Sequence, residues 1–477
     1  MKTLYAAGLA LAAALPAFDA RAQSTDPASA AAAADMRALR QQLDALRNDY
    51  EARLQSLEAR LRAAEAARAT SAASAPAASP PVAAAALPAG PIATAAPPAA
   101  GGGANAFNPA ISLILSGLYA NASRDPSSYA IRGFALPARA EAGPGSRGFS
   151  LAESELGLSA SVDPWWLGSA SIAIHGDDSV SVEEAYVQTT ALGNGLTLKA
   201  GRFFSNIGYL NPKHAHAWDF VDNPLVYQAM LGTQYGDDGV QLRWLAPIDR
   251  YVELGAELGR GRSFPGSDSA RNGAGMWSLS AHTGGDIGDS QDWRAGVSLL
   301  GTRANGLGLV HTDATGRTVE NAFTGTSRVF VADAVWKWAP GGNATRTSFT
   351  LQGEYLRSRR RGELLYDVGG AESAGDVRAT QSGWYVQGVY QFAPRWRLGL
   401  RTERLDPGHT DYGANAGLLA PASGRPGKTS LMLDYSASEF SRLRLQFALD
   451  RAREGAADRQ VFLQYQMSLG AHGAHGY

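Results

Sequence analysis

The sequence predicts an all-β fold, a 16-stranded antiparallel β-barrel formed by residues 107–477. Three observations predict it. Segments of roughly ten residues alternate apolar and polar side chains, which is the pattern of strands with two different faces. Tight turns alternate with longer loops between these segments, and most tryptophans lie beside the turns.

The alternation is most regular towards the C-terminus. Leu443, Leu445 and Phe447 alternate with Arg444 and Gln446, and a similar pattern follows from Val461 to Leu469. Sixteen such segments begin near Ile111, Phe149, Leu167, Ser181, Leu196, Gly239, Tyr251, Met276, Asp292, Arg328, Ser348, Gly383, Arg395, Thr429, Arg442 and Gln460.

The connections favour a transmembrane barrel over a soluble one. Every second connection is a tight turn, such as Asp163-Pro164 or Gly193-Asn194-Gly195, whereas most of the others are long. Short turns on one side and long loops on the other are typical of outer-membrane barrels. A mean hydropathy of -0.18 is compatible with this, because only alternate residues would face lipid. The predicted long loops span 120–148, 203–238, 301–327, 357–382 and 405–428.

Tryptophan positions point the same way. Of ten tryptophans, seven lie within a few residues of the tight turns, and Trp277 and Trp384 open strands that leave the long-loop side. Indole rings prefer the membrane–water boundary, so two aromatic belts are expected. Only Trp218 has no place in them.

Three segments precede the barrel. Residues 1–22 have the basic start, short apolar core and Ala20-Arg21-Ala22 ending of a secretory signal peptide. Residues 35–68 carry leucines at spacings of 3 and 4, which predicts a short α-helical coiled coil and self-association as a dimer or trimer. Residues 69–106 are Ala/Pro-rich and predict a disordered linker.

Composition excludes several functions. The formal charge of -1 gives no reason to expect nucleic-acid binding, and the absence of cysteine excludes disulfides and thiol chemistry. No GxSxG, HExxH or P-loop spacing occurs, so we expect neither an enzyme nor a cofactor.

One stretch, Gly201 to Asp238, breaks the alternation. It is too rich in aromatic and apolar residues to be disordered, and long ordered loops are usually functional. Polar and aromatic residues concentrate in nine positions of this stretch: His214, His216, Trp218, Asp219 and Asp222.

The chain resembles Gram-negative outer-membrane porins. The start FNPAISLILSGLYA (Phe107 to Ala120) and the stretch GRFFSNIGYLNPKHAHAWDFVDNPLVY (Gly201 to Tyr227) resemble an uncharacterised branch of the phosphate-selective porin-like superfamily, some members of which are labelled TonB-dependent receptors. The resemblance implies a trimer in which the third surface loop folds into the barrel. It therefore implies that the five residues above lie at the pore constriction.

Strand phase supplies the residues expected to line the pore. If the apolar side chains face lipid, acidic and basic residues both point inward, the acidic ones mainly early and the basic ones late in the chain. These residues are Glu153, Glu155, Arg243, Glu253, Glu257, Arg294, Glu354, Arg397, Arg401, Glu403, Arg442 and Arg444. They either impose a transverse field or are ordinary solvated charges paired across strands.

The sequence thus predicts an outer-membrane channel for passive diffusion of small charged solutes, with its coiled coil in the periplasm. The alternative is a receptor or channel for metal uptake, TonB-linked, in which His214 and His216 bind zinc. A TonB-dependent receptor needs a barrel of about 22 strands with a plug, which the N-terminal residues cannot supply. The solute and the ion preference do not follow from the sequence.

Overall fold

The computed structural model describes residues 109–137, 140–268, 272–419 and 424–470. The signal, coiled-coil and linker segments predicted for residues 1–22, 35–68 and 69–106 lie outside these ranges. Within the described ranges, none of the helices has the length and apolarity needed to cross a membrane.

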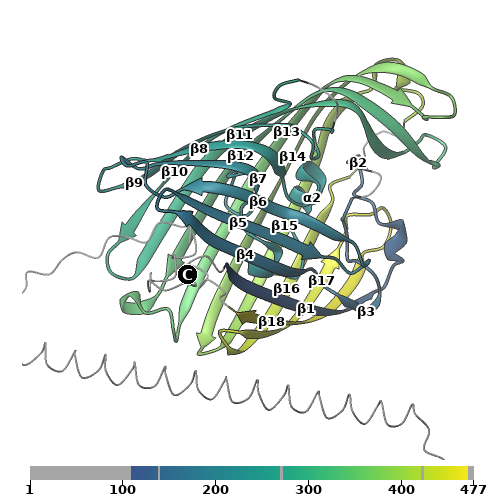
Figure 1. Cartoon of the computed structure of the whole chain (residues 1–477). Helices are drawn as coiled ribbons and strands as arrows, with labels where there is room; N and C mark the ends of the chain where they lie inside the picture. The colour runs from purple at the N-terminus through teal and green to yellow at the C-terminus, as the bar shows by residue number, and fades with distance from the viewer. Residues whose placement is uncertain (1–108, 138–139, 269–271, 420–423, 471–477) are drawn as a thin grey trace, which may run out of the picture. The chain divides into compact units, whose positions relative to one another are not determined.

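The described residues form one antiparallel sheet that closes on itself (Figure 1). β1 pairs with β18 along one edge and with β3 and β4 along the other. The strands are β1 Ala110–Ala122, β2 Leu136–Pro137, β3 Gly148–Leu151, β4 Ser154–Asp163, β5 Trp166–Ile174, β6 Val180–Thr189, β7 Leu196–Phe204, β8 Gly236–Leu245, β9 Tyr251–Gly259, β10 Met276–Ile287, β11 Gln291–Thr312, β12 Thr318–Trp338, β13 Ser348–Tyr366, β14 Ser373–Ala393, β15 Trp396–Asp411, β16 Gly427–Ser438, β17 Ser441–Asp450 and β18 Asp458–Gly470.

The barrel wall has sixteen strand positions, because two of the 18 strands do not add a position of their own. β3 and β4 are two parts of one wall strand beside β1, and β2 is a two-residue pairing with β11 inside a loop. The predicted 16-stranded antiparallel barrel is therefore confirmed, and each predicted segment corresponds to one strand of the ring.

The two faces of the wall differ as the alternation predicts. On β17 and β18, Leu443, Phe447 and Leu463 are exposed on the outer face, whereas Arg444 and Gln446 are buried on the inner face. Nine of the ten tryptophans, all of them among the described residues, are partly or fully exposed. Trp218 is the exception, with 7 % of its surface exposed.

Three of the predicted long loops are wrong in extent. The β11–β12 and β13–β14 hairpins continue to Thr312 and Tyr366, so segments predicted as loops at 301–327 and 357–382 are mostly strand; β15 likewise extends to Asp411. The green strands of Figure 1 accordingly run well past the rest of the wall. In these extensions the polarity of the two strand faces is reversed. Arg357 and Arg359 are exposed on the outer face, whereas Leu364 is buried on the inner face.

The inverted extensions enclose a separate apolar core at their far end. It contains buried side chains from β11 to β14 and from two loops: Phe264, Ala304, Leu309, Val319, Phe323, Leu364, Tyr366, Val377 and Leu419.

Candidate functional site

The connection between β7 and β8, residues 205–235, folds into the barrel. We call this segment the inner loop. It contains a 3-10 turn, η2 (Ala215–Ala217), and a short helix, α2 (Leu225–Leu231), whose residues are all buried. α2 ends at Gly232, which adopts the left-handed conformation with φ 67° that glycine tolerates best.

Asn211 closes the neck of the inner loop. Its Nδ2 donates to the carbonyls of Ser205 (2.8 Å) and Tyr235 (2.9 Å), and its Oδ1 accepts from the Tyr235 N–H at 2.8 Å. One fully buried amide therefore ties together the two ends of the segment where they leave β7 and enter β8.

The inner loop contacts the wall far from its own strands. Glu354 on β13 accepts hydrogen bonds from the Leu210 N–H at 2.8 Å and from the Tyr227 hydroxyl at 2.6 Å. Glycine at position 208 allows this approach, since a Cβ there would lie 2.5 Å from the Glu354 carboxylate. Glu403 on β15 accepts from the Leu225 N–H at 2.5 Å. Because β15 is eight places from β7 in the ring of sixteen, the loop crosses the interior.

The two aspartates of the inner loop bind basic side chains on β15 and β16. Asp219 accepts from Arg397 at 2.9 Å, while Asp222 lies 2.8 Å from Arg401 and 2.5 Å from Lys428. Burial alone would raise the pKa of Asp222, but these two cations outweigh burial and hold its pKa below the ordinary 3.8.

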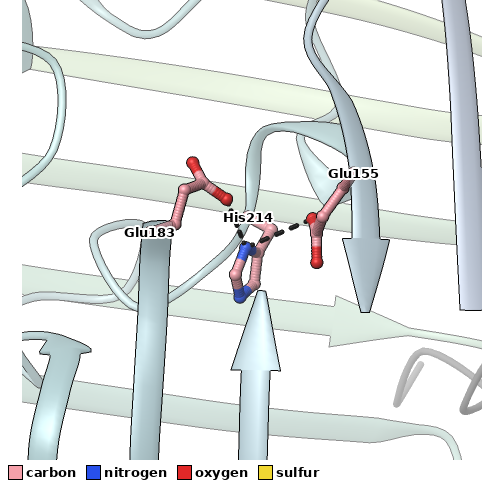
Figure 2. A group of neighbouring side chains, drawn as sticks. All are labelled: Glu155, Glu183 and His214. Atoms are coloured by element: carbon pink, nitrogen blue, oxygen red, sulfur yellow. Dashed lines mark hydrogen bonds and ion pairs between the residues drawn. The ribbon is translucent and has the colours of Figure 1, made fainter. Parts of the chain in front are cut away.

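The two histidines bind carboxylates on β4 and β6 instead. Nδ1 of His214 lies 3.1 Å from Glu183 Oε2 and 3.3 Å from Glu155 Oε2, and its Nε2 lies 3.0 Å from Glu184. Figure 2 shows His214 between Glu183 and Glu155. Nδ1 of His216 lies 2.8 Å from Glu155, and the two imidazole rings stack. Burial opposes protonation of His214, but the carboxylates outweigh it and raise its pKa well above 6.5.

Burial is the larger effect at His216, whose pKa is lowered despite the nearby Glu155. The indole N–H of Trp218 donates to the Lys213 carbonyl at 2.9 Å, and its ring packs into the main interior cluster of apolar side chains.

The residues predicted to line the pore fall into three groups in the structure. Arg397, Arg401, Arg442 and Arg444 share the β15–β17 wall, where Asp434 accepts from Arg444 at 2.8 Å and Arg442 donates to the His216 carbonyl at 2.9 Å. Glu354 on β13 and Glu403 on β15 accept hydrogen bonds from the inner loop, and the other six lie on or next to strands β4 to β11. Of these, Glu153 lies 3.9 Å from His175, Arg243 lies 3.7 Å from Glu253, Glu257 accepts from the Asn206 N–H, and Arg294 lies over the Tyr209 ring.

Several residues of this site did not emerge from the sequence. Glu183 and Glu184 are adjacent, so simple alternation would point only one of them inward. A register shift opposite Ser171 and Ile172 makes Glu183 the extra residue of a β-bulge, and both carboxylates then reach His214. Lys428 was not among the residues predicted to line the pore, although the alternation of β16 places its side chain on the inner face.

A second loop also enters the interior. Ile131, Phe134 and Leu136, between β1 and β3, are buried in the same apolar cluster as Trp218 and α2. Their spacings of three and two positions match neither a regular strand nor a helix, so this loop had no signal in the sequence.

Comparison with known proteins gives one close relative and several distant structures. No family model matches the chain. Among solved structures, OmpT of Vibrio cholerae has a TM-score of 0.45 and 11% identity, covering 75% of this chain and 96% of that chain. The outer membrane channel DcaP of Acinetobacter baumannii has a TM-score of 0.45 and 13% identity over 75% and 96%. The anion-selective porin from Comamonas acidovorans has a TM-score of 0.44 and 12% identity over 76% and 99%.

The sequence relative is much closer. An uncharacterized protein of Aquifex aeolicus (strain VF5) is 30% identical over 397 residues, which are 78% of this chain and 80% of that protein. Because this identity extends over more than two thirds of both proteins, this chain belongs to the same family as the Aquifex aeolicus protein.

Proposed function

We propose that this protein is an outer-membrane porin, a channel for passive diffusion of small charged solutes. Its barrel closes without a free edge and exposes apolar side chains on the outside, which suits lipid on one face and a polar lumen on the other. A ring of sixteen strands supports a diffusion channel over a plugged receptor, which needs about 22.

The observation that carries the proposal is the path of the inner loop. It is the third connection on the long-loop side, and it leaves β7, meets Glu354 on β13 and returns to β4 and β6. It then reaches Arg397 and Arg401 on β15 before α2 leads back to β8. A segment held this way narrows the lumen, and constrictions of this kind set the size limit of a pore.

The charges explain why the loop holds this path. Its histidines meet the acidic side chains of β4 and β6, and its aspartates meet the basic side chains of β15 and β16. The loop is therefore complementary to two differently charged parts of the wall, and turning it over would place like charges together.

We also propose that the protein is a trimer. On the outer face of β4 to β7, side chains such as Ala160, Gly168, Ala170 and Ala185 leave an apolar hollow of about 420 Å³. Small outward side chains allow a second wall to approach closely, and the coiled-coil pattern of residues 35–68 independently favours self-association.

Planar-bilayer recording of the purified full-length chain tests the channel proposal. We expect stable stepwise conductance, and several-fold larger steps from a variant in which residues 209–232 are replaced by a short Gly-Ser linker. The control replaces the β13–β14 connection, residues 367–372, in the same way and should conduct like the natural chain. A folded barrel that gives no steps contradicts the porin, and unchanged steps in the 209–232 variant contradict the constriction. Reversal potentials in a salt gradient then give the ion preference.

A further inference from the structure

The histidine–carboxylate group at the base of the inner loop has the composition of a metal site. Glu155, Glu183 and His214 come from β4, β6 and the loop, and one ligand atom of each lies within 4.8 Å of the other two (Figure 2). Imidazole nitrogen and carboxylate oxygen together suit zinc and neighbouring divalent transition metals.

Two of the three distances between ligand atoms fit tetrahedral coordination. Zinc–nitrogen and zinc–oxygen bonds of about 2.0–2.2 Å place two tetrahedral ligand atoms about 3.3 Å apart. His214 Nδ1 lies 3.1 Å from Glu183 Oε2 and 3.3 Å from Glu155 Oε2. A single N–H at Nδ1 cannot point at both oxygens, whereas a cation between the three atoms satisfies all of them.

The surroundings of the three ligands are those of a held metal site. Glu184 lies 3.0 Å from His214 Nε2, which fixes the tautomer that leaves Nδ1 available as a ligand. Glu155 is held in turn by Ser171 and His216. The bulge that turns Glu183 inward is a feature that proteins use to re-aim a side chain next to a site.

Charge supplies an independent argument. Within the ranges that the structure describes, the ion pairs of Glu155 and Glu183 are all with histidines, and neither carboxylate has a lysine or arginine within 4.0 Å. Asp219 and Asp222, in the same loop, each have such a partner. Largely buried carboxylates are costly without a compensating cation, and the imidazoles supply only part of that charge.

The geometry points to a divalent transition-metal site formed by Glu155, Glu183 and His214, which fastens the inner loop to β4 and β6. Zinc replaces the proton at His214 Nδ1 and bridges the loop to two wall strands. This inference goes beyond the proposed channel and does not require it, since the ligands would bind metal whether or not solutes pass.

Zinc titration of the EDTA-treated full chain in detergent micelles tests the site, with a competing chromophoric chelator as the readout. We expect one zinc ion per chain and, with cobalt, the visible absorption of a tetrahedral site. Glu183→Gln and His214→Gln should remove this binding. Glu184→Gln, which alters only the hydrogen bond to Nε2, should weaken it about 10–100-fold.

The matched control is Glu253→Gln, a buried inward carboxylate 3.9 Å from another histidine, His282, and outside the cluster. It should bind zinc like the natural chain. Gel mobility before and after heating shows that each variant still forms a barrel. The site is refuted if the natural chain takes up no zinc at micromolar concentrations, or if Glu183→Gln and His214→Gln bind it undiminished. Conductance steps in EDTA from a chain that binds no zinc would refute the metal site and leave the channel in place.

Discussion

Asp222 is the residue on which the inner loop depends most. Its carboxylate meets Arg401, Lys428 and the Gln446 side chain, which come from three successive wall strands, β15, β16 and β17. Removing one partner of a buried ion pair is strongly destabilising, typically by about 3–5 kcal/mol. Arg401 keeps Glu403 and Lys428 keeps Asp450, so part of this cost is offset.

Asp222→Asn should therefore release the loop at neutral pH, and acid should do the same to the natural chain. Because the pKa of Asp222 is lowered in the folded protein, its contribution is complete above the ordinary value of 3.8 and is lost as pH falls through the lower folded value. Bilayer recordings of the natural chain should therefore show larger or noisier conductance as the pH falls below about 3.8.

The Asn variant should show that larger or noisier conductance already at pH 7. Asp238→Asn is the control, since Asp238 pairs with Arg202 beside the loop but outside the lumen-crossing part. Equal conductance of Asp222→Asn and the natural chain at pH 7 would show that Asp222 does not hold the loop.

The direction in which a side chain points could be predicted from the sequence where the strands are regular, but not at the β-bulge. Arg401 and Arg444 follow the strand phase, and both are almost fully buried on the inner face. Glu183 could not be assigned, because its direction depends on a register shift that only pairing with β5 reveals. The contact between Asp222 and Lys428 could not be predicted either, because the two residues are 206 positions apart in the chain.

At the scale of elements, the long hairpins show where hydrophobic alternation stops being informative. Up to Tyr355, β13 carries outward apolar side chains, and beyond it Arg357, Arg359 and Arg361 face outward instead. The strand continues, but its outer face no longer carries the apolar side chains that contact with lipid requires. A criterion that requires apolar outer residues therefore ends the strand too early, which is why residues 357–382 were predicted as a loop.

The apolar core inside these extensions should stabilise them locally. Phe323 is fully buried there, with Leu309, Leu364 and Val377 among its cluster. Phe323→Ala removes a large buried side chain, which typically costs about 3–5 kcal/mol. We expect faster proteolysis of the β11–β12 and β13–β14 extensions, followed by mass spectrometry, and conductance steps like those of the natural chain.

Phe330→Ala on the same strand is the control. Phe330 faces outward and is 39 % exposed, so its removal leaves no cavity in the core and should not change the cleavage rate. Equal protease resistance of the two variants would contradict a stabilising role for this core.

The whole molecule was the easiest scale to predict. Sixteen strands follow from counting because a closed antiparallel barrel repeats one pattern, and each repeat is an independent signal. The inner loop has no such repeat. The break in alternation predicted that the loop exists, but it did not predict which wall strands the loop contacts. Contacts such as Leu210 with Glu354 and Leu225 with Glu403 depend on the closed ring, which brings β13 and β15 opposite β7.

Assembly of three copies, if it uses the hollow on β4 to β7, depends on small side chains facing outward there. Gly168 tests this directly, because a Cβ at that position meets only Val162 at 3.7 Å and Ala160 at 3.9 Å, which is ordinary contact. Gly168→Trp should therefore keep the barrel intact while filling the hollow. We expect the natural chain to have the mass of three copies by light scattering in detergent, and the variant to shift towards single copies.

A tryptophan introduced at Ala334 is the control. It shows whether an added indole on the outer wall changes the oligomeric state wherever it is placed. Ala334 has the outward phase of Phe330 on β12, seven places from β5 around the ring, and tryptophan is well tolerated on a lipid-facing wall. Ala334→Trp should remain trimeric. If Gly168→Trp also stays trimeric, the copies do not meet at this hollow. If the natural chain is a single copy, the trimer itself is wrong while the channel and the constriction, which need only one barrel, are unaffected.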